Sequence, residues 1–379
     1  MKMSASRRGV LAAIAALPFV TAMSGGFSGK SAMSAEQGRG QMRTGRLFGA
    51  AVRPDQLVEE GPLLSAIRRC DMLVPEYHGQ WSAVEWRRGD PWFGNYDALA
   101  DFCDRHGQML RGHSLIWEQM TPDWARAEMM EKRDWSIVER HFANLLPRYS
   151  GRIAEWIVVN EMIDTEDGDG DMRRTSFQRA YGNGYVERAL ETARALDPHA
   201  RLMINEYALY HDNPTDEARR NALLRLVERL KARNVPLDMV GIQGHLELTK
   251  DLASQGRMAR FFRDLADMGV DLALTEVDVL ESDRTLSLEA RDARVAGAFA
   301  HILDVAESEP AMTSIVTWGL SDRHSWLQER SAETQSALNC LPLDGADLNR
   351  GLPFDAEMRP KQLQKTLAMA FPAARSALV

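Results

Sequence analysis

Two glutamates in this sequence stand near the carboxyl ends of apolar, strand-like runs. Glu161 ends the run that begins at Trp156, and Glu276 lies within the run Asp271–Val279. Runs of this kind are typical of strands buried on both faces of a parallel sheet, and polar groups at their ends must emerge into a site. Two carboxylates facing one cleft can transfer a proton and attack an electrophilic carbon. The pattern therefore predicts a catalytic carboxylate pair.

Eight apolar runs that could position these groups alternate with amphipathic, helix-like stretches. The predicted strands are Leu47–Val52, Met72–Tyr77, Met109–Trp117, Glu155–Glu161, Arg201–Tyr207, Met239–Leu246, Asp271–Val279 and Ser314–Asp322. The predicted helices are Tyr96–His106, Ser136–Tyr149, Tyr185–Leu196, Thr215–Arg233, Met258–Met268 and Leu288–Ser308. This alternation predicts an α/β fold, a single (β/α)8 TIM barrel over residues 46–375. No Gly-rich fingerprint follows the first strand, which disfavours a doubly wound nucleotide-binding sheet.

The ends of the predicted strands are unusually polar or aromatic. The residues at these ends are Glu76, His113, Trp117, Asn160, Tyr207, Gln243, His245, Asp278 and Trp318. A single strand-end glutamate is more often an ion-pair residue, but consecutive strand ends of this kind predict a lined cleft at the carboxyl end of the barrel. Carboxylates together with indole, imidazole and amide groups are suited to binding sugars and cleaving glycosidic bonds.

Composition limits the other classes of function. The formal net charge is −8, and an acidic protein is a poor candidate for binding nucleic acid, because phosphate contacts require basic surface. The cysteines are far apart and lack metal-ligand spacing, so one disulfide with a free thiol and three thiols both remain open for Cys70, Cys103 and Cys340. We expect a monomer.

The acidic segment Asp167–Asp171 could suggest a calcium loop. An EF-hand loop that began at Asp167 would need Gly where Met172 stands and Glu where Gln178 stands. We therefore interpret the segment as a solvated acidic loop and predict no metal and no cofactor.

The N-terminal residues are typical of a targeting segment. Arg7 and Arg8 follow Ser6 and precede a short apolar run, Ala12–Ala22. This pattern predicts a bacterial export signal of the twin-arginine type over residues 1–23, and the apolar run is too short to span a membrane comfortably. Gly- and Ser-rich residues 24–45 then predict a flexible leader. We expect a periplasmic or secreted protein with no membrane association after signal removal.

The chain from about Arg46 to Phe371 resembles glycoside hydrolase family 10, the retaining β-1,4-xylanases. Motifs similar to those of the family occur in the family's order at Arg111–Trp117, Trp156–Glu161, Met203–Tyr207, Gly241–Leu246, Leu274–Val279 and Thr317–Leu327. Each motif lies on or beside a predicted strand end, which makes the resemblance specific.

The resemblance implies a role for each matching residue. Glu161 would be the acid/base and Glu276 the nucleophile, and retention requires their carboxyl groups to be about 5–5.5 Å apart. Asn160 would hold the sugar 2-hydroxyl, His245 would keep Glu276 ionised, and Gln243 would support the nucleophile side. The other predicted substrate-binding or supporting residues are Glu76, His113, Trp117, Tyr207, Asp278, Trp318 and Trp326.

Four positions depart from the family pattern on the glycone side of the predicted site. This chain has Tyr77 where the family pattern has Asn, Gln80 where it has Lys, Glu118 where it has His, and Met120 where it has Gln. The substrate is therefore either a xylan-type polysaccharide bound weakly on this side, or another β-linked polymer such as a bacterial exopolysaccharide, cleaved by a related β-glycanase or transglycosylase. A non-catalytic carbohydrate-binding barrel is disfavoured, because it would have little reason to keep both glutamates.

Overall fold

The computed structural model describes residues 45–58, 60–281, 283–328 and 348–371. The predicted export signal, residues 24–44 of the predicted leader, and Cys340 lie outside these ranges. Within them, no helix combines the length and the apolar character needed to cross a membrane.

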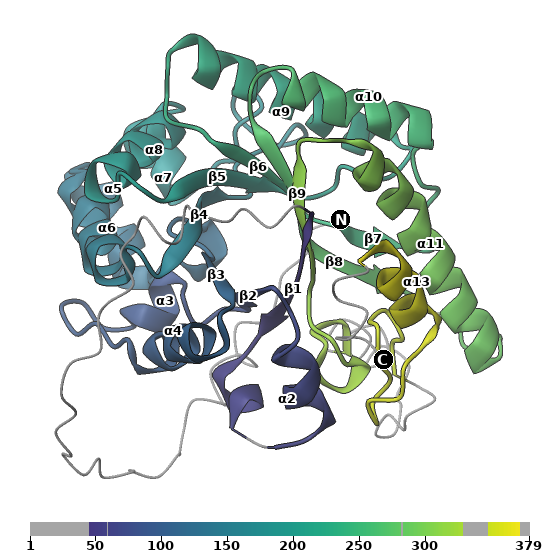
Figure 1. Ribbon diagram of the computed structural model, residues 1–379. Coiled ribbons are helices and arrows are strands. Elements are labelled where there is room, and N and C mark those ends of the chain that lie inside the picture. The colour runs from purple at the N-terminus through teal and green to yellow at the C-terminus, as the bar shows by residue number, and fades with distance from the viewer. Residues whose placement is uncertain (1–44, 59, 282, 329–347, 372–379) are drawn as a thin grey trace, which may run out of the picture. The chain divides into compact units, whose positions relative to one another are not determined.

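The described residues contain a closed barrel of parallel strands (Figure 1). The strands are β1 (Leu47–Val52), β2 (Met72–Pro75), β3 (Met109–Gly112), β4 (Ile153–Asn160), β5 (Arg201–Glu206), β6 (Met239–Ile242), β7 (His245–Glu247), β8 (Asp271–Leu280) and β9 (Met312–Thr317). The ring runs β6-β5-β4-β3-β2-β1-β9-β8 and closes where β6 pairs with β8. The predicted TIM barrel is therefore confirmed.

The predicted strands Met109–Trp117 and Ser314–Asp322 are too long, because β3 ends at Gly112 and β9 at Thr317. The predicted strand Met239–Leu246 is also wrong in its extent, because the structure divides it into β6 and β7. Gln243 still donates its backbone N–H to Glu206 O (2.8 Å), but Gly244 packs so closely on Val277 that a Cβ would lie 2.7 Å from its Cγ2 atom. After this close approach, β7 pairs only with the outer end of β8. This break places Gln243 directly after the end of barrel strand β6 and His245 on β7, outside the barrel ring.

Helices surround the barrel in Figure 1. Their bounds are α2 (Pro62–Ile67), α3 (Trp81–Val84), α4 (Gly94–His106), α5 (Asp123–Lys132), α6 (Ser136–Tyr149), α7 (Ser176–Tyr181), α8 (Tyr185–Leu196), α9 (Pro214–Ala232), α10 (Gln255–Ala266), α11 (Leu288–Ser308) and α13 (Gln362–Ala370). The starts of α9, α10 and α11 follow from local chemistry, because the side chains of Asn213, Ser254 and Ser287 cap them by accepting a backbone N–H three residues on.

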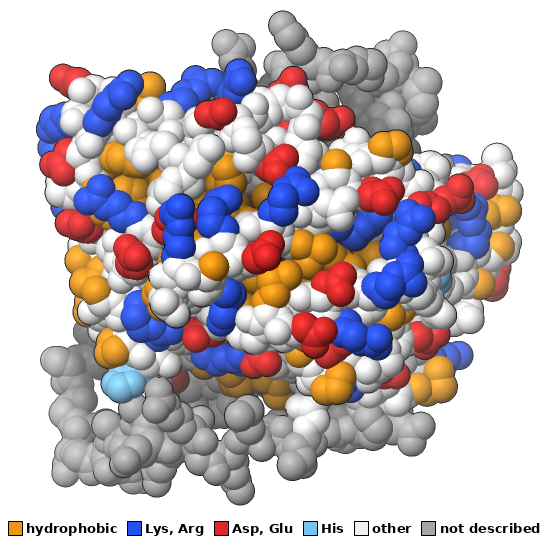
Figure 2. Space-filling view, turned by 90° about the horizontal axis from the view of Figure 1, so that it is seen from above, with side chains coloured by type: hydrophobic (Ala, Val, Ile, Leu, Met, Phe, Trp, Pro, Cys, Tyr) orange, Lys and Arg blue, Asp and Glu red, His pale blue; other side chains and the backbone are white. Residues whose placement is uncertain are grey.

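Ion pairs connect several of the outer helices. Arg229 on α9 pairs with Glu187 on α8 (3.3 Å), and Arg257 on α10 pairs with Asp212 just before α9 (2.5 Å). Acidic and basic side chains are interspersed over the face shown in Figure 2. Such exposed pairs each contribute about 0–1 kcal/mol, so apolar packing of helices on the barrel supplies most of the stability of this layer.

The interior of the barrel holds apolar side chains together with one buried ion pair. Arg111 on β3 donates Nε and Nη2 to Glu155 Oε2 (2.9 and 2.7 Å), and Nη2 also donates to Ser314 Oγ on β9 (2.7 Å). Buried apolar side chains from β4, β5, β6 and β8 form a cluster, namely Ile157, Met203, Met239 and Ala273. The interior is thus a packed core, and a site can form only at its ends.

Candidate active site

Glu161 directly follows the last residue of β4, and its backbone is in the left-handed region with φ of 59°. Few residues other than glycine adopt this conformation, which costs on the order of 1 kcal/mol. The backbone N–H of Glu161 donates to Asn205 O (2.9 Å), which holds the residue beside the end of β5. The strain is thus tolerated at a position whose side chain belongs to the cleft.

Side-chain amides connect the two predicted catalytic glutamates. Asn205 Nδ2 donates to Glu276 Oε1 (2.7 Å) and to Asn160 Oδ1 (2.9 Å). Gln243 Nε2 donates to the same Asn160 oxygen (3.3 Å) and to Glu161 Oε1 (3.4 Å). The structure therefore brings Glu161, Asn160 and Glu276 into one network, and it places Gln243 against Glu161 rather than on the nucleophile side.

His245 lies between two carboxylates. Its Nε2 is 3.2 Å from Glu276 Oε2, its Nδ1 is 2.8 Å from Asp278 Oδ1, and Trp326 Nε1 donates to Asp278 Oδ2 (2.6 Å). Burial acts to lower the pKa of His245, but Asp278 and Glu276 raise the pKa to about 10. The imidazole is therefore a cation at neutral pH and donates from both nitrogens.

The pKa values of the two glutamates are shifted in opposite directions. Burial and the charges of Glu276 and Glu206 raise the pKa of Glu161 to about 7, although the Trp117 indole N–H acts in the opposite direction. Burial would also raise the pKa of Glu276, but the hydrogen bond from His245 and other nearby donors bring the pKa below its ordinary value. One carboxyl group is thus suited to hold a proton while the other remains ionised.

Aromatic rings form walls around this pair. The ring of His113 lies 5.2 Å from that of Trp318 and 6.3 Å from that of Trp117, while the ring of His245 lies 5.0 Å from that of Trp326. Burial lowers the pKa of His113, so its imidazole is neutral near pH 7. The predicted aromatic residues are thus gathered beside the carboxylates.

The last two predicted residues contact arginines. Arg173 donates Nη2 to the Tyr207 hydroxyl (2.6 Å) and Nε to Glu161 O (2.9 Å), so Tyr207 is tied to the backbone of the acid/base candidate. Glu76 forms an ion pair with Arg53 (3.2 Å) at the end of β2. All the residues predicted from the sequence therefore lie at the carboxyl end of the barrel, in contact with one another or with neighbouring strand ends.

Comparison with known proteins decides the family. Residues 40–370 match the family described as glycosyl hydrolase family 10. The chain belongs to this family. Endo-1,4-beta-xylanase A from Phanerodontia chrysosporium is 31% identical over 260 residues, which span 67% of this chain and 60% of that protein. Endo-1,4-beta-xylanase 1 from Humicola insolens is 29% identical over 298 residues, spanning 77% and 67% of the two chains.

A solved structure supports the fold of this family 10 chain. Native xylanase 10B from Thermotoga maritima aligns with a TM-score of 0.73 at 23% identity, covering 88% of this chain and 96% of that one. The match over residues 40–370 confirms the family and the glycoside hydrolase class predicted from the sequence, and this structure supports the fold.

At three of the positions that depart from the family pattern, the structure shows what the replacing side chain does. Tyr77 is 41% exposed, and its ring stacks on that of the next residue at 4.2 Å. Gln80 is 1% exposed, and within the described part of the chain its side-chain amide has no hydrogen-bond partner. Glu118 Oε2 accepts from the backbone N and Oγ of Ser176 (3.0 and 2.7 Å), and Arg126 lies 3.5 Å from Oε1. The charge of Glu118 is thus compensated by its own neighbours.

Two residues of the family 10 site were given no role from the sequence. Asn205 contacts the nucleophile candidate, and its position at the end of the fifth strand was a signal that could have identified it. Gln119 donates to Glu161 Oε2 (3.3 Å) from a short turn after Trp117. No periodicity or spacing distinguishes Gln119 in the sequence.

Other features that the sequence singled out lie apart from this site. In the acidic loop, Asp169 accepts from Gln178 (3.0 Å) and Asp171 pairs with Arg225 (2.6 Å). Among the described residues, no group of three or more His, Cys, Asp or Glu side chains could hold a metal ion. Cys70 and Cys103 are buried free thiols.

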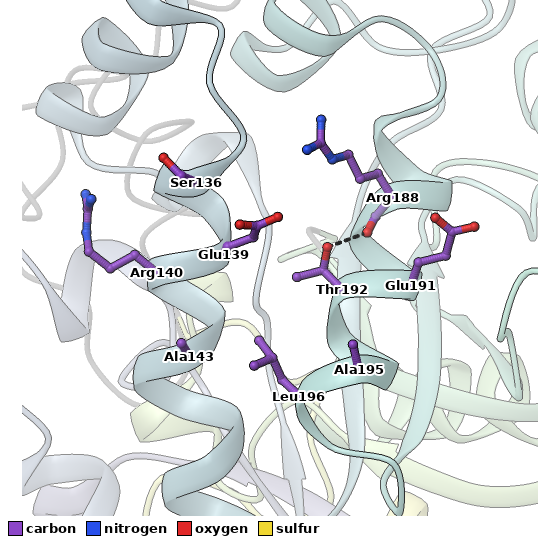
Figure 3. Close-up of a pocket in the computed structure, with 9 residues that line it drawn as sticks. All are labelled: Ser136, Glu139, Arg140, Ala143, Arg188, Glu191, Thr192, Ala195 and Leu196. Atoms are coloured by element: carbon purple, nitrogen blue, oxygen red, sulfur yellow. Dashed lines mark hydrogen bonds between the residues drawn. The ribbon is translucent and has the colours of Figure 1, made fainter.

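An open groove of about 650 Å³ lies between α6 and α8, and Figure 3 shows the residues that line it. Glu139 and Arg140 line it from α6, and Arg188, Glu191 and Thr192 from α8. These residues belong to the outer helices and not to the strand ends, so the groove is separate from the carboxylate pair.

Proposed function

We propose that this family 10 chain is a retaining endo-acting glycoside hydrolase that cleaves β-1,4 linkages of a xylan-type polysaccharide. The observation that carries the proposal is the pair of linked carboxyl groups with opposite pKa shifts, Glu161 raised and Glu276 lowered. The names of the xylanases to which the chain is similar support the choice of substrate. The proposed chemistry invokes no cofactor.

In the first step, the ionised Glu276 attacks the anomeric carbon while the protonated Glu161 gives its proton to the leaving glycosidic oxygen. A carbon–oxygen bond to Glu276 forms, and the glycosidic bond breaks. His245 and Asn205 hold the nucleophile by hydrogen bonds to its two oxygens. We assign Asn160 Nδ2 to the sugar 2-hydroxyl, because Asn160 Oδ1 already accepts two amide N–H groups.

The second step needs Glu161 as a base. The charge of Glu276 contributes to the raised pKa of Glu161, and this charge disappears when Glu276 becomes an ester. The pKa of Glu161 therefore falls in the intermediate, so its carboxylate can take a proton from water as the water attacks the anomeric carbon. The ester bond breaks, Glu276 regains its charge, and Glu161 is reprotonated.

A second candidate substrate is another β-linked polymer. The environments of Tyr77, Gln80 and Glu118 favour this alternative, because a buried amide and a compensated carboxylate replace the cation and the imidazole that the family pattern has there. An exposed aromatic ring at Tyr77 provides a stacking surface for a sugar in place of an amide. Transglycosylation would use the same catalytic residues.

The test is hydrolysis of a panel of β-glycans by the wild type and by Glu276→Ala. The panel holds linear xylan, glucuronoxylan, mixed-linkage glucan, a soluble cellulose derivative and bacterial exopolysaccharides, with products sized and their anomeric form followed by NMR. We expect β-anomeric xylo-oligosaccharides that the substitution abolishes. Cleavage of another polymer with silence on xylan would select the second candidate, and silence on every polymer would contradict the proposal.

We also propose export through residues 1–23, supported by the paired Arg7 and Arg8 before an apolar run. Replacing both arginines by Lys should retain the protein in the cytoplasm of a bacterial host, as measured by cell fractionation. Size-exclusion chromatography with light scattering tests the expected monomer.

A further inference from the structure

The turn that follows Trp117 brings a glutamine to the acid/base candidate. Gln119 lies in the 3-10 turn Glu118–Met120, and its Nε2 donates to Glu161 Oε2 (3.3 Å). We infer that Gln119 is a positioning residue that favours the ionised form of Glu161 and leaves Oε2 as the oxygen that carries the catalytic proton. The inference rests on the acid/base role proposed for Glu161.

The two oxygens of Glu161 have different partners. Oε1 accepts from Gln243, which is 2% exposed and whose Nε2 also donates to Asn160. Both hydrogens of this amide are engaged, so it cannot turn away without breaking two bonds. Oε2 accepts from Gln119, whose side chain is exposed and can rotate into solvent. When Glu161 takes up a proton, Oε2 is therefore the oxygen whose partner can move aside.

The backbone that carries Gln119 is held on both sides. Glu118 is anchored by Ser176 Oγ (2.7 Å), and Thr121 Oγ1 donates to Trp117 O (2.7 Å). The carbonyl oxygen of Met120 also accepts a hydrogen bond from the hydroxyl of Ser82 on α3 (2.7 Å). The turn is thus fixed by its neighbours while the Gln119 side chain itself is exposed.

Gln119 should lower the pKa of Glu161, because it donates a hydrogen bond to the carboxylate. An N–H group that donates to a carboxylate stabilises the charged form and lowers the pKa, which opposes the burial that raises the pKa of Glu161. Gln119 would therefore favour the base form needed in the second step. Because the amide is exposed, it can release Oε2 for the first step at little cost.

The experiment compares Gln119→Met, which removes the donor at similar length, with the isosteric Gln119→Glu. The control is Gln255→Met on α10, because Gln255 is also exposed and donates Nε2 to a carboxylate, Asp304 Oδ2 (3.2 Å). The carboxyl carbon of Glu161 is titrated by NMR in protein labelled with 13C-glutamate, with the signal assigned by Glu161→Gln. The pH dependence of kcat/KM on xylo-oligosaccharides is measured in parallel.

We expect Gln119→Met to raise the pKa of Glu161 by about 0.5 unit and Gln119→Glu to raise it by about 1 unit, because the second change also adds a like charge. The alkaline limb of kcat/KM should move upward by the same amounts, and Gln255→Met should leave both readouts unchanged. Near-UV circular dichroism confirms that each variant is folded.

An unchanged or lowered pKa of Glu161 in both folded Gln119 variants would overturn the inference. If the wild type hydrolyses xylan in that case, the proposed function stands and only the role of Gln119 fails. If the wild type hydrolyses nothing on the panel, the proposed function fails, while the NMR titration still decides whether Gln119 governs the protonation of Glu161.

Discussion

Replacing His245 by Gln should raise the pH below which the enzyme loses activity. The cation lies 3.2 Å from Glu276 Oε2, and Coulomb's law at that separation with an effective dielectric constant of about 20 gives an upper bound of about 5 kcal/mol. Because His245 is partly exposed, solvent reduces this interaction, and an opposite charge at such a distance typically shifts a carboxyl pKa by about 1–3 units.

We therefore expect the pKa of Glu276 to rise by about 2 units in His245→Gln. Removing a cation disfavours the carboxylate, so Glu276 becomes protonated at a higher pH, and the acid limb of kcat/KM moves upward. The alkaline limb, set by the Glu161 pKa of about 7, moves less. The pH range of activity should narrow from its acid side.

The assay is kcat/KM for an aryl β-xylobioside between pH 3 and pH 9, with folding checked by circular dichroism at each end. His301→Gln on α11 is the matched control, because His301 is partly buried and its Nε2 lies 2.8 Å from the Ala253 carbonyl oxygen rather than beside a carboxylate. If the acid limb of the folded His245→Gln variant lies within about 0.3 pH unit of the wild-type limb, the reasoning is refuted, because a neighbouring charge usually shifts a carboxyl pKa by much more than this.

Three further outcomes follow from the structure. Asn205→Ala removes the bond to Glu276 and should lower kcat/KM on xylan by about 10–100-fold, since amide donors of this kind are catalytically important; an unchanged value would contradict it. Gly112→Ala would place a Cβ 2.1 Å from Trp156 Cε3 and should destabilise the fold by about 1–3 kcal/mol, measured by urea unfolding. Above the Glu161 pKa of about 7, kcat/KM should fall about tenfold per pH unit, and with an activated aryl glycoside the Glu161→Gln variant should lack this limb.

Much of the barrel could be predicted from periodicity. The helices α6, α8 and α11 and the strand β1 have the predicted bounds, because their apolar periodicity is local in sequence. The division of Met239–Leu246 into β6 and β7 could not be predicted. It depends on the contact of Gly244 with Val277, which belongs to a strand more than thirty residues away.

The sequence by itself determined which residue types end each strand, and parallel strands bring those ends to one edge of the barrel. From this alone Glu161 and Glu276 could be predicted to share a cleft. Only the tertiary structure decided that Gln243 and Gln119 contact different oxygens of Glu161. Side-chain hydrogen bonds and pKa shifts depend on distances of a few ångströms and on burial, which are set by packing between segments far apart in the chain.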